Sequence, residues 1–219
     1  MTRTPKHHPT GPASARGLLI GHLAHTPELH TCADGLVRCS IELDAITASF
    51  VQSHSVGPVV ATAAVAAEVA GELSRGDEVA LVVEVDGQTG HPLGFVVRQF
   101  YVPLPLGAGA DRPEWPSGHA PGCPIVGGMF RLSHRPAIRT SPRHSPYAGM
   151  PVGELVVSKP RPLKPLAVFG RLAGCAANLR AGSDAMVLVD DDPAIDALCV
   201  WAIFVRPSEA RRIRQKTAA

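Results

Sequence analysis

Basic side chains concentrate between positions 131 and 180, where Glu154 is the single acidic residue. Tyr147 stands among them, in the segment SPRHSPYAG. Guanidinium and ammonium groups neutralise phosphates, and aromatic rings offer faces on which unpaired bases stack. This combination predicts a surface for single-stranded nucleic acid. The basic residues are Arg131, Arg135, Arg139, Arg143, Lys159, Arg161, Lys164, Arg171 and Arg180.

A solvated face whose charges serve only solubility is the alternative interpretation of these residues. Tyr147 favours binding, because an exposed aromatic ring among cations suits base stacking. No apolar pattern surrounds Tyr147 in the hairpin expected there, so we expect its side chain to be exposed and the fold to survive its loss. We expect Arg139, Arg143 and Arg171 to contact phosphates.

Residues able to hold a metal or perform catalysis show no recognisable spacing. Six residues separate Cys32 from Cys39, with His30 nearby, and this is not the C-x2-C spacing of a zinc knuckle. The acidic run at 190–192 is typical of a turn between strands. The sequence contains no Gly-rich phosphate loop, nucleophile elbow or HExxH motif. We therefore expect no metal, no cofactor and no enzymatic activity.

The composition is that of a folded and nearly neutral protein. Of the 219 residues, 45% are hydrophobic, and the net charge of +2 does not by itself indicate a polyanionic partner. Five cysteines at irregular spacing suit free thiols in a reducing compartment. No apolar run approaches the roughly 18 residues of a transmembrane helix, and residues 1–16 lack the apolar core of a signal peptide. The expected location is the cytoplasm.

Hydrophobic alternation predicts five strands and one helix in the first part of the chain. Strands are expected at 17–24, 36–46, 77–87 and 94–104, and PVVATAAVAAEVAGEL predicts a short strand that runs into a helix ending near Leu73. The order of these elements, β-β-β-α-β-β, is that of an OB-fold. One face of the second strand is expected to carry Val37, Cys39, Ile41 and Leu43.

The pattern restarts after a segment dense in Pro and Gly. GGMFRLSHRPAIRT corresponds to IGHLAHTPELHT, and ALCVWAIFVRP corresponds to GFVVRQFYVP. A repeat that preserves element order predicts two copies of one domain, and chance recurrence of short apolar-Gly patterns is the alternative. The expected fold is all-β with one short helix per domain, as two tandem OB-fold barrels. Its parts are a flexible arm (1–16), an OB-fold domain (17–106), a Pro/Gly linker (107–124), a second OB-fold domain (125–207) and a basic tail (208–219).

Two segments carry a resemblance to a known family. LIGHLAHTPELHT resembles the opening of bacterial single-stranded DNA-binding proteins, in which the first strand leads into a glycine, a leucine and a Pro-Glu-Leu turn. VFGRLAGCAANLRAGSDAMVLV resembles the third strand, helix and fourth strand of the same family, with Phe169, Gly170 and Arg171 matching its Phe-Gly-basic cluster. The resemblance covers most of 17–102 and 125–206. It implies OB folds and sequence-tolerant binding of single-stranded DNA.

The sequence departs from the family pattern at three places. The tryptophan that usually precedes the third strand is missing from both copies, HSVGPVV and PLKPLAV. Thr62, Ala63 and Ala64 stand in the first copy where the second has its Phe-Gly-basic cluster, and the chain ends on basic EARRIRQKTAA instead of an acidic tail. We therefore expect the second copy to carry more of the affinity. In the first copy the candidate contacts are Phe50 and His54, in the loop before the third strand.

The sequence thus predicts a protein that coats single-stranded DNA without strong sequence preference and protects it during replication, recombination or repair. The alternative is a degenerate OB-fold interaction module in a replication, plasmid or phage assembly, with weak or no DNA binding; the aromatic content of only 5% favours it. Because members of the family usually need four OB domains to wrap a strand, the resemblance implies a homodimer. Replication proteins are expected as further partners, and a membrane is not.

Overall fold

A computed structural model of the chain describes residues 16–49, 58–85, 94–106, 126–145, 147–159, 162, 164–192 and 196–218. These residues form fourteen strands and three helices, so the protein is mostly β. None of the helices among these residues is long and apolar enough to cross a membrane.

The first half of the chain, residues 16–106, follows the expected element order with two changes. The strand predicted at 36–46 is divided at Glu42, and a short additional strand precedes it. The elements are β1 (Arg16–Leu23), β2 (Leu29–Thr31), β3 (Val37–Ile41), β4 (Leu43–Ser49), β5 (Val59–Thr62), α1 (Ala63–Glu72), β6 (Glu78–Val85) and β7 (Phe95–Pro103).

Alternation decides which side chains of β3 face the core. Cys39 and Ile41 are buried, as the sequence predicts, and Leu43 packs against the same core. Val37 shares their face but is 37% exposed. β5 pairs with Arg38–Ile41 and ends there, whereas Val37 pairs only with Thr31 of β2, in the part of the hairpin that extends past β5. The β2–β3 hairpin therefore projects from the first half.

The second half, residues 126–218, repeats the element order and adds a helix. Its elements are β8 (Val126–Leu132), β9 (Ile138–Thr140), β10 (Pro151–Glu154), β11 (Val157–Lys159), β12 (Leu166–Phe169), α2 (Gly170–Ala176), β13 (Asp184–Asp192), β14 (Ala197–Val205) and α3 (Pro207–Ala218). The added helix is α3. The segment expected as a basic tail, 208–219, is helical, whereas α2 is the short helix between strands within 125–207 in the described residues.

Strand pairing follows one scheme in both halves. In the first, β1 pairs with β4 and β6, β6 with β7, β7 in parallel with β5, β5 with β3, and β3 with β2. In the second, β8 pairs with β11 and β13, β13 with β14, β14 in parallel with β12, β12 with β10, and β10 with β9. Helix α1 thus connects β5, which is parallel to β7, with β6. Helix α2 likewise connects β12, which is parallel to β14, with β13.

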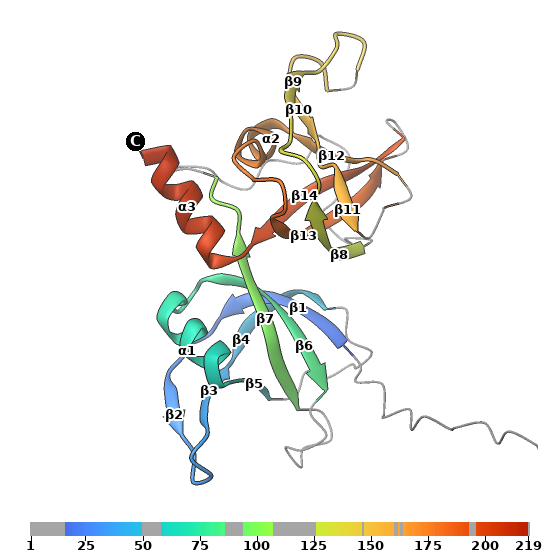
Figure 1. Cartoon of the computed structure of the whole chain (residues 1–219). Helices are drawn as coiled ribbons and strands as arrows, with labels where there is room; N and C mark the ends of the chain where they lie inside the picture. Colours follow the sequence, from blue (N-terminus) through green and yellow to red (C-terminus); the bar gives the residue numbers. More distant parts are fainter. Residues whose placement is uncertain are drawn as a thin grey trace, which may run out of the picture.

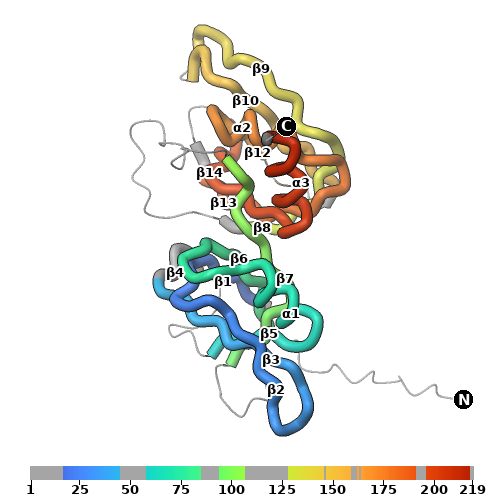
Figure 2. The backbone as a smooth tube through the Cα atoms, turned by 90° about the vertical axis from the view of Figure 1, so that its left-hand side faces the viewer, coloured from blue at the N-terminus to red at the C-terminus, as the bar shows by residue number. Residues whose placement is uncertain are grey.

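Figures 1 and 2 show the two halves as two lobes of an elongated molecule. The hairpins β2–β3 and β9–β10 lie at its opposite ends, and β7 leads from one lobe to the other. A short antiparallel ladder between β7 and β14 joins the lobes, with Val102 opposite Val205 and Pro103 opposite Phe204.

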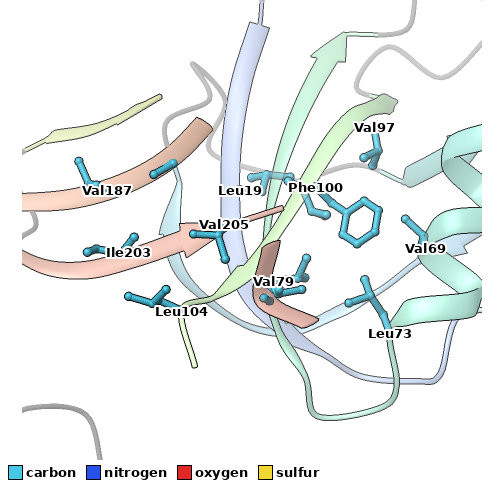
Figure 3. Close-up of a cluster of buried hydrophobic side chains, with 14 of the residues drawn as sticks. Leu19, Val69, Leu73, Val79, Val97, Phe100, Leu104, Val187, Ile203 and Val205 are labelled. Atoms are coloured by element: carbon cyan, nitrogen blue, oxygen red, sulfur yellow. The ribbon is translucent and has the colours of Figure 1, made fainter. Parts of the chain in front are cut away.

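A buried apolar core continues through both lobes. Figure 3 shows Phe100 next to Leu19 and pointing toward Val69 of α1, while Val205 of β14 leads on to Ile203, which lies beside Leu104 and Val187. α1 contributes because Ala66 and Val69, three residues apart, face the same side of a helix.

A second buried cluster lies on the opposite face of the central strands. The first half contributes Ile20, Ala80 and Tyr101, and the second half contributes Met186, Leu188 and Phe204. Arg206 covers the Tyr101 ring, with its guanidinium carbon 4.7 Å from the ring centroid. This cluster packs the two lobes against each other.

Helix α3 contacts both halves. Ala210 and Ile213, again three residues apart, are buried. Arg211 forms an ion pair with Glu72 of α1, and Arg212 donates to the carbonyl oxygen of Asn178 at 2.6 Å. Helix α3 therefore links the second half to the first through contacts with Glu72 and Asn178.

Candidate nucleic-acid interface

Three side chains form a row across the outer face of β9, β10 and β12. Arg139 lies opposite Val152, and Val152 lies opposite Phe169. Directly opposite residues in antiparallel strands point to the same face, with Cβ atoms about 4.5–5.5 Å apart. The next row, which includes Gly153 and Val168, faces the core. We call Arg139, Val152 and Phe169 the outer row; Arg139 is exposed and the other two are half-buried.

Tyr147 packs on the end of this row. Its ring centroid lies 4.2 Å from that of Phe169, with the ring planes tilted by 31°. Only 6% of Tyr147 is exposed, so the expectation of an exposed side chain is wrong. The loop that carries it is closed by hydrogen bonds between Ser141 and Met150 and between Tyr147 N–H and Ser145 Oγ, which turn the ring back over Phe169. The two rings form one aromatic unit, which Val152 separates from Arg139.

Two more predicted cations lie near this unit. Arg143 is exposed in the β9–β10 loop, and Arg171 is exposed on the first turn of α2. Arg139 and Arg143 have no ion-pair partner among the residues that the structure describes. Arg139, Arg143 and Arg171, the expected phosphate contacts, are thus all exposed; their binding of nucleic acid stays a prediction.

The junction between strand and helix is the same in both halves. Gly170 has φ +56° at the start of α2, and Ala63 has φ +51° at the start of α1. Both residues adopt the left-handed conformation that glycine reaches without steric cost. The junction places Phe169 in the second half, and Thr62 in the first, directly before the helix.

The first half presents a weaker version of the outer row. His30 lies opposite Arg38, and Arg38 lies opposite Thr62. Arg38 Nη2 bonds to Asp34 Oδ2 at 2.6 Å, which neutralises its charge locally. The row therefore has no aromatic ring and a compensated cation, because Thr62 occupies the place that Phe169 has in the second half.

Other predicted site residues lie away from the outer row. Arg131 Nε donates to Gly182 O at 3.2 Å, and Arg135 Nε donates to Ala177 O at 2.6 Å, so both reach the loop between α2 and β13. Lys164 pairs with Asp196 at 3.6 Å. The backbone of Lys159, in β11, lies opposite that of Arg131, in β8. Phe50, His54 and Arg161 lie outside the described residues.

Burial makes two cysteines poor nucleophiles. It raises the pKa of the Cys39 thiol, and it raises that of Cys175, which nearby Arg171 partly opposes. Among the residues that the structure describes, no three His, Cys, Asp or Glu side chains are grouped to hold a metal ion.

Sequence reasoning missed the part played by the α2–β13 loop and α3. Arg180, Arg212 and Lys216 gather at that loop together with Arg131 and Arg135. The sequence shows that the C-terminal segment is basic. It does not show that this segment lies near Arg131 and Arg135, because that depends on how α3 packs.

Comparisons with known proteins give weak likenesses. No protein-family model and no curated protein matches the chain. Among solved structures, it is similar to a single-stranded DNA binding protein from Thermus aquaticus, with a TM-score of 0.30 and 19% identity over 86% of this chain and 90% of that one. A small single-stranded DNA-binding protein from Streptomyces coelicolor gives a TM-score of 0.30 and 18% identity, over 41% of this chain and 93% of that one.

Proposed function

We propose that the chain is a tandem pair of OB-fold domains that binds single-stranded DNA, and that the second half supplies most of the affinity. The observation that carries this proposal is the outer row, in which Val152 separates exposed Arg139 from half-buried Phe169, the ring that packs against Tyr147. A cation suits a phosphate and a partly exposed ring on the same face suits a base, so the row matches the repeating chemistry of an unpaired strand. None of these groups distinguishes one base from another, which predicts weak sequence preference.

The OB-fold assignment is supported by the repeated pairing scheme. In the first half β3 pairs with β5, and β4 pairs with β1. Only Glu42 separates β3 from β4, so these two strands connect β5 to β1. In the second half β10 and β11 make the equivalent connection. The proposed domains span 17–106 and 125–207, with the 107–124 segment between them.

The alternative function, an interaction module with weak or no DNA binding, is favoured by the β2–β3 hairpin. Leu29, Leu36 and Val37 are exposed there, and the cation of its outer row is paired with Asp34. Aliphatic side chains offer no ring for base stacking. If the first half binds protein instead of DNA, the two functions divide between the halves.

The test is a salt titration of an oligothymidine, followed by fluorescence anisotropy with the full chain. Loss of one phosphate contact should reduce the magnitude of the slope of log affinity against log salt concentration by about 0.7. We expect this change for Arg139→Ala and for Arg143→Ala. Arg38→Ala is the matched control, since that arginine occupies the first half's row and is already paired, and it should leave the slope nearly unchanged.

A second substitution separates stacking from charge. Phe169→Leu keeps apolar bulk beside Tyr147 but removes the ring face, which is worth about 1–3 kcal/mol per stacked base. Affinity should therefore fall at every salt concentration, with the slope retained. If Arg38→Ala and Arg139→Ala have equal effects, the assignment to the second half is wrong. If the wild type does not bind at moderate salt, the interaction module replaces the proposal.

We further propose that two chains associate, so that four OB-fold domains act together. β2 and β9 each pair with a single neighbour among the described strands and so present edges to a partner. Light scattering at micromolar concentration should give twice the monomer mass, and a monomer would contradict the proposal. The proposed setting is replication, recombination or repair in the cytoplasm, with replication proteins as partners. Affinity capture that persists after nuclease treatment would identify them.

A further inference from the structure

The loop between α2 and β13, residues 177–183, gathers basic side chains from three directions. Arg135 Nε donates to Ala177 O at 2.6 Å, and Arg131 Nε donates to Gly182 O at 3.2 Å. From α3, Arg212 donates to Asn178 O at 2.6 Å, and Lys216 Nζ donates to Asn178 Oδ1 at 3.1 Å. The loop itself carries Arg180. We call Arg131, Arg135, Arg180, Arg212 and Lys216 the basic loop cluster.

Two carboxylates only partly balance the cluster. Glu209 is bonded to Arg212, and the Arg212 hydrogen bond, with help from nearby Arg180, holds the pKa of Glu209 below its usual range. Asp184 lies 3.4 Å from Arg131. Five cations therefore face two anions, and the surplus of positive charge stands on exposed Arg135, Arg180 and Lys216.

The corresponding loop of the first half lacks this arrangement. His22 Nδ1 lies 3.3 Å from Gly76 O, where Arg131 reaches Gly182 O in the second half. Ser74 stands at the place of Arg180, since the N–H of Asp77 bonds to its carbonyl oxygen as the N–H of Ser183 bonds to that of Arg180. The arginine of this loop, Arg75, is one position further on and is exposed. No helix in the described residues follows β7 as α3 follows β14. The surplus charge is thus specific to the second half.

Helix α2 connects the cluster to the outer row. Phe169 precedes its first residue and Ala177 follows its last, and its seven residues span about 10 Å. Arg171 is exposed between these two points. We propose that the basic loop cluster is a second phosphate-binding surface, which holds the backbone of single-stranded DNA beyond the outer row. This inference rests on the proposed function, because the same strand would occupy both surfaces.

A nucleic-acid backbone fits the cluster better than an acidic peptide does. Arginine presents five N–H donors, so a guanidinium bonded to one carbonyl oxygen retains donors for a phosphate. A groove of mixed polar and apolar lining lies on the other side of α3, against Leu73 and Leu104. It carries three carboxylates (Glu72, Asp77 and Glu78) and two cations (Arg211 and Arg214), so the surplus of positive charge is on the cluster and not in this groove.

The experiment compares two lengths of oligothymidine on the full-length protein. A strand of about 8 nucleotides falls within the range of a single OB fold, and one of about 30 exceeds it. Arg180→Gln and Lys216→Gln should each flatten the salt slope for the long strand by about 0.7 and leave the short strand unaffected. Arg75→Gln, at the exposed arginine in the corresponding loop of the first half, is the control and should change neither slope. Glutamine keeps a donor for the loop oxygens, and the unchanged short-strand affinity reports an intact fold.

Three results would overturn the inference, and they separate it from the proposed function. If the variants bind the long strand like the wild type while the short strand still binds, the outer row works alone. If Arg75→Gln has the same effect as Arg180→Gln, the change reflects overall charge. If a labelled oligo-glutamate peptide binds the cluster and displaces no DNA, the occupant is an acidic protein segment. Failure of the wild type to bind either strand would instead remove the proposed function.

Discussion

A substitution at Tyr147 changes packing as well as any contact with a base, because the ring is buried against Phe169. Tyr147→Ala should lower the free energy of unfolding by about 3 kcal/mol, the lower part of the range for removing a buried aromatic side chain. Tyr147→Phe keeps the ring pair and should cost less. Thermal melts of the two variants check this. Equal stability of Tyr147→Ala and wild type would mean that the ring is not held as described.

Ala63 adopts a conformation that suits glycine. Its φ of +51° costs an L-residue roughly 1–2 kcal/mol, and Gly170 occupies the equivalent place in the second half. We expect Ala63→Gly to stabilise the chain by several tenths of a kcal/mol, after the greater backbone entropy of glycine in the unfolded state is subtracted. The reverse exchange in the same helix, Gly71→Ala, is the matched control.

Gly71 lies inside α1, with open space where a Cβ atom would stand. Alanine should therefore also stabilise there, by about 0.5–1 kcal/mol. Both variants are measured by chemical denaturation at constant m-value. If Ala63→Gly destabilises as an ordinary helix glycine would, the left-handed junction is not present in solution.

At the level of elements, alternation predicted most strands but not their ends. Cys39 and Ile41 are buried as expected because the period of two fixes their face. The break at Glu42 and the projection of the β2–β3 hairpin depend on which strands lie beside them, and no local pattern records that. Tyr147 was misjudged for the same reason: Phe169, which covers it, is 22 positions away in sequence and becomes its neighbour only through the pairing of β10 with β12.

Helix α3 was missed because its apolar signal is small. Ala210 and Ile213 are its buried apolar residues, and the rest of EARRIRQKTA is polar or basic. Of the site residues expected from the sequence, Arg139 and Phe169 lie in the outer row, while Arg143 and Arg171 lie in the β9–β10 loop and on α2; that these residues contact DNA stays a prediction. Arg131 and Arg135 were named too, but their place beside α3 required the tertiary structure.

The contacts of α3 predict an acid sensitivity. Hydrogen bonds from Arg212 and Ser183 hold the pKa of Glu209 below its ordinary value of 4.5. A carboxyl group whose pKa is lowered by folding stabilises the folded state above its unfolded pKa, and this contribution is lost as the pH falls through the folded pKa. Glu209→Gln should therefore lower the free energy of unfolding at pH 7. The variant should also lose less of this free energy than the wild type does as the pH falls below about 4.5.

Thermal melts from pH 7 to pH 3 compare Glu209→Gln with wild type. Glu68→Gln on α1 is the control, since that carboxylate is exposed. The two curves of wild type and Glu209→Gln should converge in acid. Curves that stay parallel over the whole range would show that Glu209 does not couple α3 to the fold.

At the scale of the molecule, the two halves meet through corresponding residues. Val102 lies opposite Val205, and these valines hold the same place in the corresponding runs QFYVP and AIFVRP. The buried cluster between the lobes likewise combines Tyr101 with Phe204 and Ala80 with Met186. If the halves are copies of one domain, as proposed, they pack about a local two-fold axis in the manner of a homodimer.

Such packing predicts that the halves unfold together. Ile20 and Tyr101 of the first half and Met186 of the second are each 0% exposed, so separating the lobes would expose them. Calorimetry should give one transition, with the calorimetric and van't Hoff enthalpies equal. Two resolved transitions would show that each half is stable without the other.

The ring contact between the halves provides the local test of that coupling. The Arg206 guanidinium lies 4.7 Å from the centroid of the buried Tyr101 ring, and a cation–π contact of this kind contributes about 0.5–2 kcal/mol. Arg206→Ala should lower the Tm by roughly 2–4 °C for each kcal/mol lost in a chain of this length. Arg214→Ala, an exposed position on α3, is the control and should melt like the wild type. Because the remaining buried cluster still joins the lobes, Arg206→Ala should keep a single transition; a transition that splits would place most of the coupling in this one contact.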